Sequence, residues 1–99
     1  MKNLAFPLVR ELKMISGGIE TSLIVSVGGI EQLAERKFVC HFSLPRIGFE
    51  EDRVTGCDPL HALELCLRTI SRLIRATNED GLAEIWWHTK GDNGGFLFS

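Results

Sequence analysis

Apolar and polar residues alternate over several segments of the chain, which is the pattern of half-buried strands. The alternation is clearest from Lys37 to Leu44, where every second side chain is apolar. Leu8 to Ile15 and Glu20 to Val27 are also predicted as strands, with a glycine pair between them that suits a tight turn. Pro45 ends the regular ladder, and Ile47 to Val54 is predicted as a short, irregular strand.

Residues 28–36 separate two predicted strands and carry a weaker signal. Gly28 and Gly29 are expected to end the strand before them. Residues 31–36 have helical propensity but are too few to form a stable helix on their own. We therefore expect residues 30–36 to form a long hairpin connection, with one helical turn at most.

One long amphipathic helix is predicted from Pro59 to about Thr77. Asp58 can accept hydrogen bonds from the first free amides of the helix, and Pro59 suits the first helical position. Apolar residues then recur at spacings of three and four, at Leu63, Cys66, Leu67, Ile70, Leu73 and Ile74. A helix with one such stripe is expected to pack on a sheet.

The C-terminal residues predict a hairpin. Ala83 to His88 has the composition of a strand, a glycine-rich turn follows, and the apolar residues Phe96 to Phe98 come after the turn. Strands on both sides of a single helix, joined by short links, indicate an α+β fold in which the helix covers one face of an antiparallel sheet. With 99 residues, the chain is expected to form a single domain over residues 1–99.

Charge and composition limit the kinds of partner that the chain is expected to bind. The chain has 11 Lys and Arg against 13 Asp and Glu, whereas binding to nucleic acid usually requires a basic surface, so nucleic acid is not an expected partner. The N-terminal residues do not form the apolar run of a signal peptide, and no segment approaches the roughly 20 apolar residues that span a membrane. Three cysteines do not make a disulfide framework, which favours a cytoplasmic location.

The cysteines offer candidate chemistry, and each has a structural alternative. Cys57 precedes the helix, where the helix dipole favours a thiolate, and His61 lies one turn on, as a nucleophile and base would. However, the negative charge of Asp58 disfavours a thiolate at Cys57. Cys40 and Cys66 fall on apolar faces, and the chain has no Cys-x-x-Cys pair. No catalytic residue, metal site or cofactor is therefore expected.

Two adjacent tryptophans are harder to explain by the core alone. Neighbouring strand residues point to opposite faces, so Trp86 and Trp87 cannot both enter one core. If Trp87 faces the helix, Trp86 and His88 face outward, and His41 joins them where the strands are neighbours. Such an exposed aromatic and histidine patch is typical of protein-binding surfaces. The alternative is that a loop such as residues 45–55 folds over Trp86.

A second candidate surface is basic. Arg68, Arg72 and Arg75 line the exposed side of the predicted helix, and Glu64 is placed to pair with Arg68. An acidic partner could dock there, because complementary charge steers association. The alternative is an ordinary solvated helix face. A homodimer is compatible with either surface, since the outer strands of an open sheet leave unpaired backbone groups.

The segment GCDPLHALELCL, residues 56–67, resembles the signature of a group of small uncharacterised bacterial domains. In that group a Gly-x-Asp turn opens a helix reading Ala-Leu-x-Leu-Ala-Leu, and a Trp-containing strand and a Gly-Phe ending follow. The resemblance extends over residues 38–98 and includes Trp86 or Trp87 and Gly95-Phe96. His61 stands where the group commonly has glutamine, and Cys66 where it has alanine. The resemblance implies a fold and no catalytic residue.

These observations favour a non-enzymatic, cytoplasmic α+β domain that binds another protein, as an immunity-type or accessory factor. The expected surface is formed by Trp86, His88 and His41, or by Arg68, Arg72 and Arg75. The alternative is a small-molecule binder or a thiol-dependent enzyme that uses Cys57 and His61.

Overall fold

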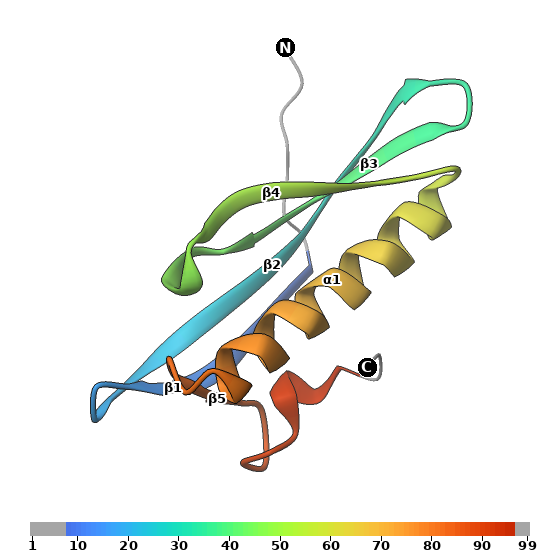
Figure 1. Ribbon diagram of the computed structural model, residues 1–99. Helices are drawn as coiled ribbons and strands as arrows, with labels where there is room; N and C mark the ends of the chain where they lie inside the picture. Colours follow the sequence, from blue (N-terminus) through green and yellow to red (C-terminus); the bar gives the residue numbers. More distant parts are fainter. Residues whose placement is uncertain (1–7, 97–99) are drawn as a thin grey trace.

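The computed structural model describes residues 8–96, which form five strands and one long helix (Figure 1). In chain order the elements are β1 (Leu8–Ser16), β2 (Ile19–Ala34), β3 (Lys37–Leu44), β4 (Phe49–Gly56), α1 (Pro59–Glu79) and β5 (Glu84–Trp86). Single 3-10 turns lie at Pro45–Ile47, before β4, and at Asn93–Gly95, after β5.

The strands form one antiparallel sheet in the order β4-β3-β2-β1-β5. The first four strands follow one another as a meander, and the chain then returns through α1 to place β5 beside β1. The helix runs obliquely along one face of the sheet (Figure 1). This arrangement confirms the predicted α+β class, in which a sheet buries one face under a helix.

The core lies between α1 and the sheet. Leu12, Leu23, Phe42 and Ile85 come from four different strands, and each is at most 1% exposed. The helix contributes Ala62, Cys66, Ile70 and Ile74, at a spacing of four, all fully buried. The predicted stripe residues Leu63, Leu67 and Leu73 are partly buried against this cluster. The predicted apolar face of α1 is therefore the face that packs on the sheet.

The helix begins at Pro59, as predicted, and continues two residues beyond the predicted end. Asn78 connects this end to the segment that follows. Its Oδ1 accepts from the Ile85 amide at 2.7 Å, and its Nδ2 donates to the Ile85 carbonyl at 3.0 Å and to Asn93 Oδ1 at 2.8 Å. One side chain thus joins α1, β5 and the last turn. In the described part of the chain, no helix is both long and apolar enough to cross a membrane.

The predicted connection over residues 30–36 is wrong. β2 continues through it to Ala34, and only Glu35 and Arg36 form the turn, with Arg36 at φ 61°. Register shifts after Gly28 and Gln32 let the strand absorb extra residues, and Gly29 adopts φ 66°. Pairing with β3 therefore overrides the local helical propensity, because an isolated helix of this length is not stable.

The predicted C-terminal hairpin is present only in part. β5 pairs with β1 over three residues, and the chain then leaves the sheet at Trp87. Asp92 explains this short strand, since its carboxylate accepts from the amides of Trp87, His88 and Thr89 at 2.9–3.0 Å. Those amides are bound to a side chain and not to a strand. The predicted strand at Phe96–Phe98 lies mostly outside the described residues.

Candidate functional site

Cys57 and His61 meet at the start of α1, in an arrangement that caps the helix. The Cys57 amide donates to Nδ1 of His61 at 2.9 Å, and the His61 amide donates to Oδ1 of Asp58 at 2.8 Å. Side chain and backbone thus bond reciprocally across the first turn, as in a capping box. The imidazole nitrogen nearest Cys57 is occupied by the backbone amide, so the observed role of His61 is structural.

The other two cysteines lie in the core. Cys40 on β3 and Cys66 on α1 are fully buried and free, whereas Cys57 is free and exposed. A hydrogen bond between the two buried thiols, together with burial, raises the pKa of Cys66. Within residues 8–96, no cluster of three or more His, Cys, Asp or Glu side chains is arranged to hold a metal ion.

His41 is not on an exposed patch, contrary to expectation. It points away from the helix, yet it is only 6% exposed. Its Nε2 lies 3.8 Å from Oε1 of Glu31 and has no hydrogen-bond partner in the described structure. A register shift between Gly28 and Glu31 places Glu31 opposite Val39, two residues before His41 on β3. His41 is therefore a buried residue on the face of the sheet that points away from the helix.

Trp86 also faces away from the helix, as predicted, but it is only 7% exposed. The ammonium group of Lys90 lies 5.1 Å from the centre of its ring, so the turn after β5 folds back over the indole. The alternative that a loop covers Trp86 is therefore supported, but the loop is not residues 45–55, because β4 and β5 are at opposite edges of the sheet. The expectation of an exposed Trp86 is wrong.

The predicted aromatic and histidine patch does not assemble. His41 is on β3 and Trp86 on β5, with β2 and β1 between them. Three strand spacings, roughly 14 Å, lie between these residues across the sheet, and they are also offset by six residues along β2, since His41 pairs with Gly28 whereas Trp86 is level with Ser22. His88 is exposed, but its ring stacks on Trp87 with the ring centres 3.9 Å apart. The structure therefore does not bring these three predicted surface residues together.

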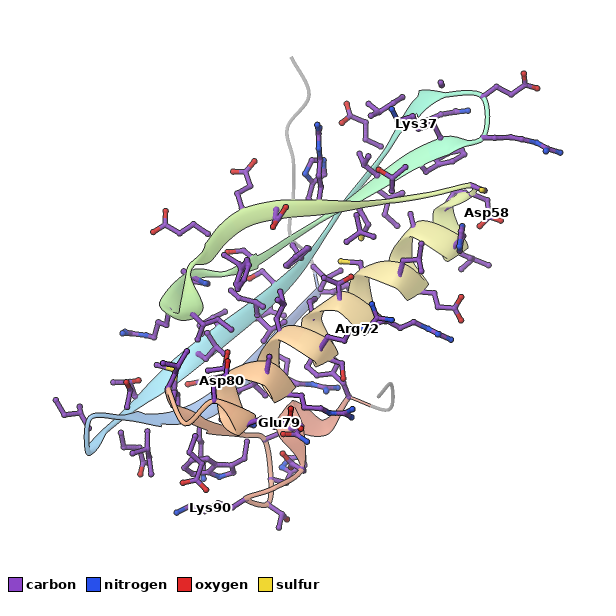
Figure 2. All side chains as sticks on the ribbon, viewed as in Figure 1. Lys37, Asp58, Arg72, Glu79, Asp80 and Lys90 are labelled. Atoms are coloured by element: carbon purple, nitrogen blue, oxygen red, sulfur yellow. The ribbon has the colours of Figure 1, made fainter. Side chains whose placement is uncertain are left out.

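The predicted basic face of α1 is present. Arg68 and Arg72 are exposed, and Arg75 is half-exposed. Nη2 of Arg68 lies 3.7 Å from Oε2 of Glu64, one turn earlier, as predicted. Arg72 projects from the helix toward solvent (Figure 2). Paired surface charges of this kind contribute little stability, so the face is as compatible with binding an acidic partner as with an ordinary solvated helix surface.

The sequence did not reveal that the two edges of the sheet differ. The β4 edge carries the charged run Glu50, Glu51, Asp52 and Arg53, all exposed, and such charges discourage pairing with another strand. At the other edge, β5 pairs only with Lys13–Ile15 of β1. Among the described residues, Leu8–Leu12 has no strand on that side. We call Leu8–Leu12 the open edge.

The hairpin between β1 and β2 shows which backbone groups the open edge presents. Gly17-Gly18 forms a two-residue turn with both φ angles positive, and Ser16 pairs with Ile19. Such a turn makes the closing pair a hydrogen-bonded one, and every second residue from Ser16 then bonds to β2. The intervening residues face the other way. Val9 and Glu11 therefore direct their amides and carbonyls toward the open edge.

An apolar groove of about 170 Å³ lies on the helix side of the open edge. It is lined by Leu8, Val9, Arg10, Val25, Val27, Leu63, Leu67 and Phe96. Leu8 and Val9 are 54% and 60% exposed, which leaves two large apolar side chains in solvent on a strand that, among the described residues, is paired on one side only at this point. The adjacent Leu8 and Val9 at the start of a predicted strand were the only sequence signal of this site.

Among the described residues that line the groove, Arg10 is the one that carries a charge. Its guanidinium lies 3.8 Å from the ring centre of Trp87 and 4.7 Å from that of Phe96, and Nη1 donates to the Gly94 carbonyl at 3.1 Å. The cation is thus held between two aromatic rings. This contact ties the segment after β5 to β1 and fixes a positive charge beside the open edge.

Comparison with known proteins identifies a family for this chain. A family model described as a domain of unknown function (DUF6968) matches residues 8–98. No curated protein and no solved structure shows significant similarity to the chain.

Proposed function

The chain belongs to this family of unknown function, and we propose that it is a protein-interaction module that binds its partner at the open edge. The observation that carries this proposal is the difference between the two sheet edges. The β4 edge carries a run of charged residues, whereas the open edge has no strand beside it within residues 8–96 and carries exposed Leu8 and Val9 and an apolar groove. Unprotected edges of this kind pair readily with another chain.

The contacts at the start of α1 support a binding role without catalysis. His61 caps the backbone there, and the two other cysteines are buried. An accessory or immunity-type factor in the cytoplasm acts by docking on another protein, and three free cysteines are compatible with a reducing compartment. The exposed Arg68 and Arg72 are a second proposed contact, because they lie on the solvent side of α1 and their positive charge complements an acidic surface.

Site-specific photo-crosslinking in the native cells tests the proposed surface. A photoreactive amino acid at Val9 samples the open edge, and the same group at the exposed Thr55 samples the β4 edge as a matched control. We expect a discrete crosslinked protein from position 9 and none from position 55. The same product from both positions, or products from position 55 alone, would remove the open edge as the binding surface.

The thiol-dependent alternative is tested by the reactivity of Cys57. Because His61 Nδ1 accepts a backbone amide, we expect Cys57 to react with a disulfide reagent at neutral pH no faster than glutathione does. Cys57→Ser is the control that assigns the signal to this residue. A rate well above that of glutathione, lost in His61→Ala, would favour the enzyme.

A further inference from the structure

We infer that the occupant of the open edge is an extended segment of a different protein, carrying an acidic residue two positions from a large apolar residue. This inference rests on the proposed function and names the chemistry of its partner. It follows from the backbone groups, the groove and the charge of Arg10, which all lie within a few residues of one another on β1.

The backbone of the open edge selects an extended partner. Val9 and Glu11 each direct one amide and one carbonyl outward, and these groups match the spacing of another strand. A segment of about five residues would satisfy them before meeting β5, which lies opposite Lys13–Ile15 and ends opposite Lys13. The partner therefore adds to the sheet as a further strand next to β1.

The helix side of the open edge selects the partner's side chains. When a partner strand pairs with β1, its residues opposite Leu8 and Arg10 point to the same face of the sheet as Leu8 and Arg10 do. That face carries the groove. A large apolar side chain opposite Leu8 would lie against Leu63 and Leu67. A carboxylate opposite Arg10 would meet the guanidinium, to which the structure gives one hydrogen bond, to Gly94.

Arg10 also argues against a second copy as the occupant. A two-fold pairing that uses both Val9 and Glu11 must place Val9 opposite Glu11 of the other copy, because these residues carry the outward backbone groups. Arg10 then lies opposite Arg10 of the other copy at about 5 Å, and like charges directly opposite are destabilising. A partner with an acidic residue at that position removes this conflict.

Selection from a displayed library of random twelve-residue peptides tests the inference directly. We expect wild-type protein to enrich peptides with Asp or Glu two positions from a large apolar residue. A synthetic peptide of the enriched sequence should lose about tenfold in affinity when the amides facing β1 are N-methylated, or when Val9→Pro removes the matching donor. Val9→Ala keeps that amide and serves as the control for Val9→Pro.

Charge reversal tests the role of Arg10. Arg10→Glu should shift the preferred residue from acidic to basic, and a Lys-containing peptide should restore binding. If Arg10→Glu does not fold, Arg10→Gln should weaken the acidic peptide about tenfold and leave a neutral analogue unchanged. Enrichment of no peptide, or of peptides that are indifferent to Val9→Pro and to Arg10, would overturn the inference.

The mass of the protein in solution tests the remaining possible occupant of the open edge, which is a second copy of the chain. Light scattering should give a monomer of 11.1 kDa. A dimer that Val9→Pro converts to a monomer would assign the open edge to a second copy and overturn the inference. If a partner still crosslinks at Val9 while no peptide binds, the proposed function stands and only the partner chemistry is wrong.

Discussion

Single side chains fix the path of the backbone after β5. Asp92 accepts four amides, from Trp87, His88, Thr89 and Gly94. Burial alone would raise the pKa of its carboxyl group, but these hydrogen bonds outweigh burial and lower the pKa to about 2. The four donors stabilise the charged form, so the turn after β5 depends on an ionised Asp92.

We therefore expect Asp92→Ala to lower the free energy of unfolding at pH 7 by about 1 kcal/mol, since the carboxylate is half-exposed. The pKa of Asp92 in the folded state is below the usual value of about 3.9, so this stabilisation is complete above about pH 4. It is lost as the pH falls toward 2. Urea unfolding of both proteins across this range should show the difference disappear, and a constant difference would contradict the role of the charge.

His61 shows what a local motif does and does not predict. Asp58 and Pro59 predicted the start of α1 because capping depends on adjacent residues. The bond from the Cys57 amide to His61 was not predicted, because it depends on how the imidazole is oriented. Glutamine has a side-chain oxygen that can accept the same amide.

His61→Gln is accordingly expected to unfold at a temperature close to that of wild type. His61→Ala should lose about 0.5 to 1 kcal/mol of stability, because the Cys57 amide then has no side-chain acceptor. Thermal unfolding monitored by circular dichroism measures both variants. Equal losses in the two would show that the imidazole acts by packing and not as an acceptor.

At the scale of elements, close approach of β4 to α1 depends on Gly56. A β-carbon at this position would lie 2.7 Å from the Cα of Ala62 and 2.8 Å from the carbonyl carbon of His61. Backbone atoms cannot move aside as a flexible side chain could. The glycine of the Gly-x-Asp turn is therefore required by the packing of the strand end on the first helical turn.

Gly56→Ala should be strongly destabilising, by about 3 kcal/mol, since the added methyl group overlaps the helix backbone. Cys57→Ala, at the exposed neighbouring position, is the matched control and should stay within about 0.5 kcal/mol of wild type. Chemical unfolding of the two variants compares them. A mild effect at Gly56 would mean that β4 and α1 can separate without loss of the core.

The elements that the sequence predicted well are those determined by local pattern. β3 has the predicted bounds because its alternation is unbroken, and Pro45 lies directly after it. The predicted β2 was too short, because the length of this strand depends on its pairing with β3. The predicted β5 was too long, because Asp92 binds the amide that would continue the strand. The open edge depends on strand order, which no local pattern contains, and it therefore could not be predicted.

At the scale of the whole molecule, one layer of helix stabilises one sheet. Asn78 joins α1 to β5, and Arg10 joins β1 to the segment after β5. Both tryptophans lie in this region, at Trp86 and Trp87. Tryptophan fluorescence thus reports the β5 region, whereas far-ultraviolet circular dichroism reports the helix and sheet together.

We expect the two signals to give the same midpoint in urea, because these side chains couple β5 to the rest of the core. Asn78→Ala should separate them, with fluorescence changing at the lower concentration. Separate midpoints already in wild type would show that the region after α1 unfolds independently.

Because Trp86 is buried, substituting it tests the stability of the fold before it tests partner binding. A side chain that is 7% exposed should cost about 3 kcal/mol when truncated to alanine, even though it lies on the face opposite the helix. Loss of partner binding in Trp86→Ala would then reflect unfolding. Thermal unfolding of Trp86→Ala measures this loss of stability. An unchanged midpoint would mean that the fold does not depend on Trp86, and loss of partner binding would then indicate a surface contact.

The strand order also determines when the sheet is completed during synthesis. β1 through β4 can pair as soon as each follows its neighbour, whereas β5 joins β1 only after some 70 residues of intervening chain have left the ribosome. Until then the whole length of β1 is unpaired on one side, although α1, which precedes β5 in the chain, has already emerged. The nascent chain is therefore exposed to misassociation along β1 until its last strand emerges, and segments that bind β1 at that stage would compete with β5 for Lys13–Ile15.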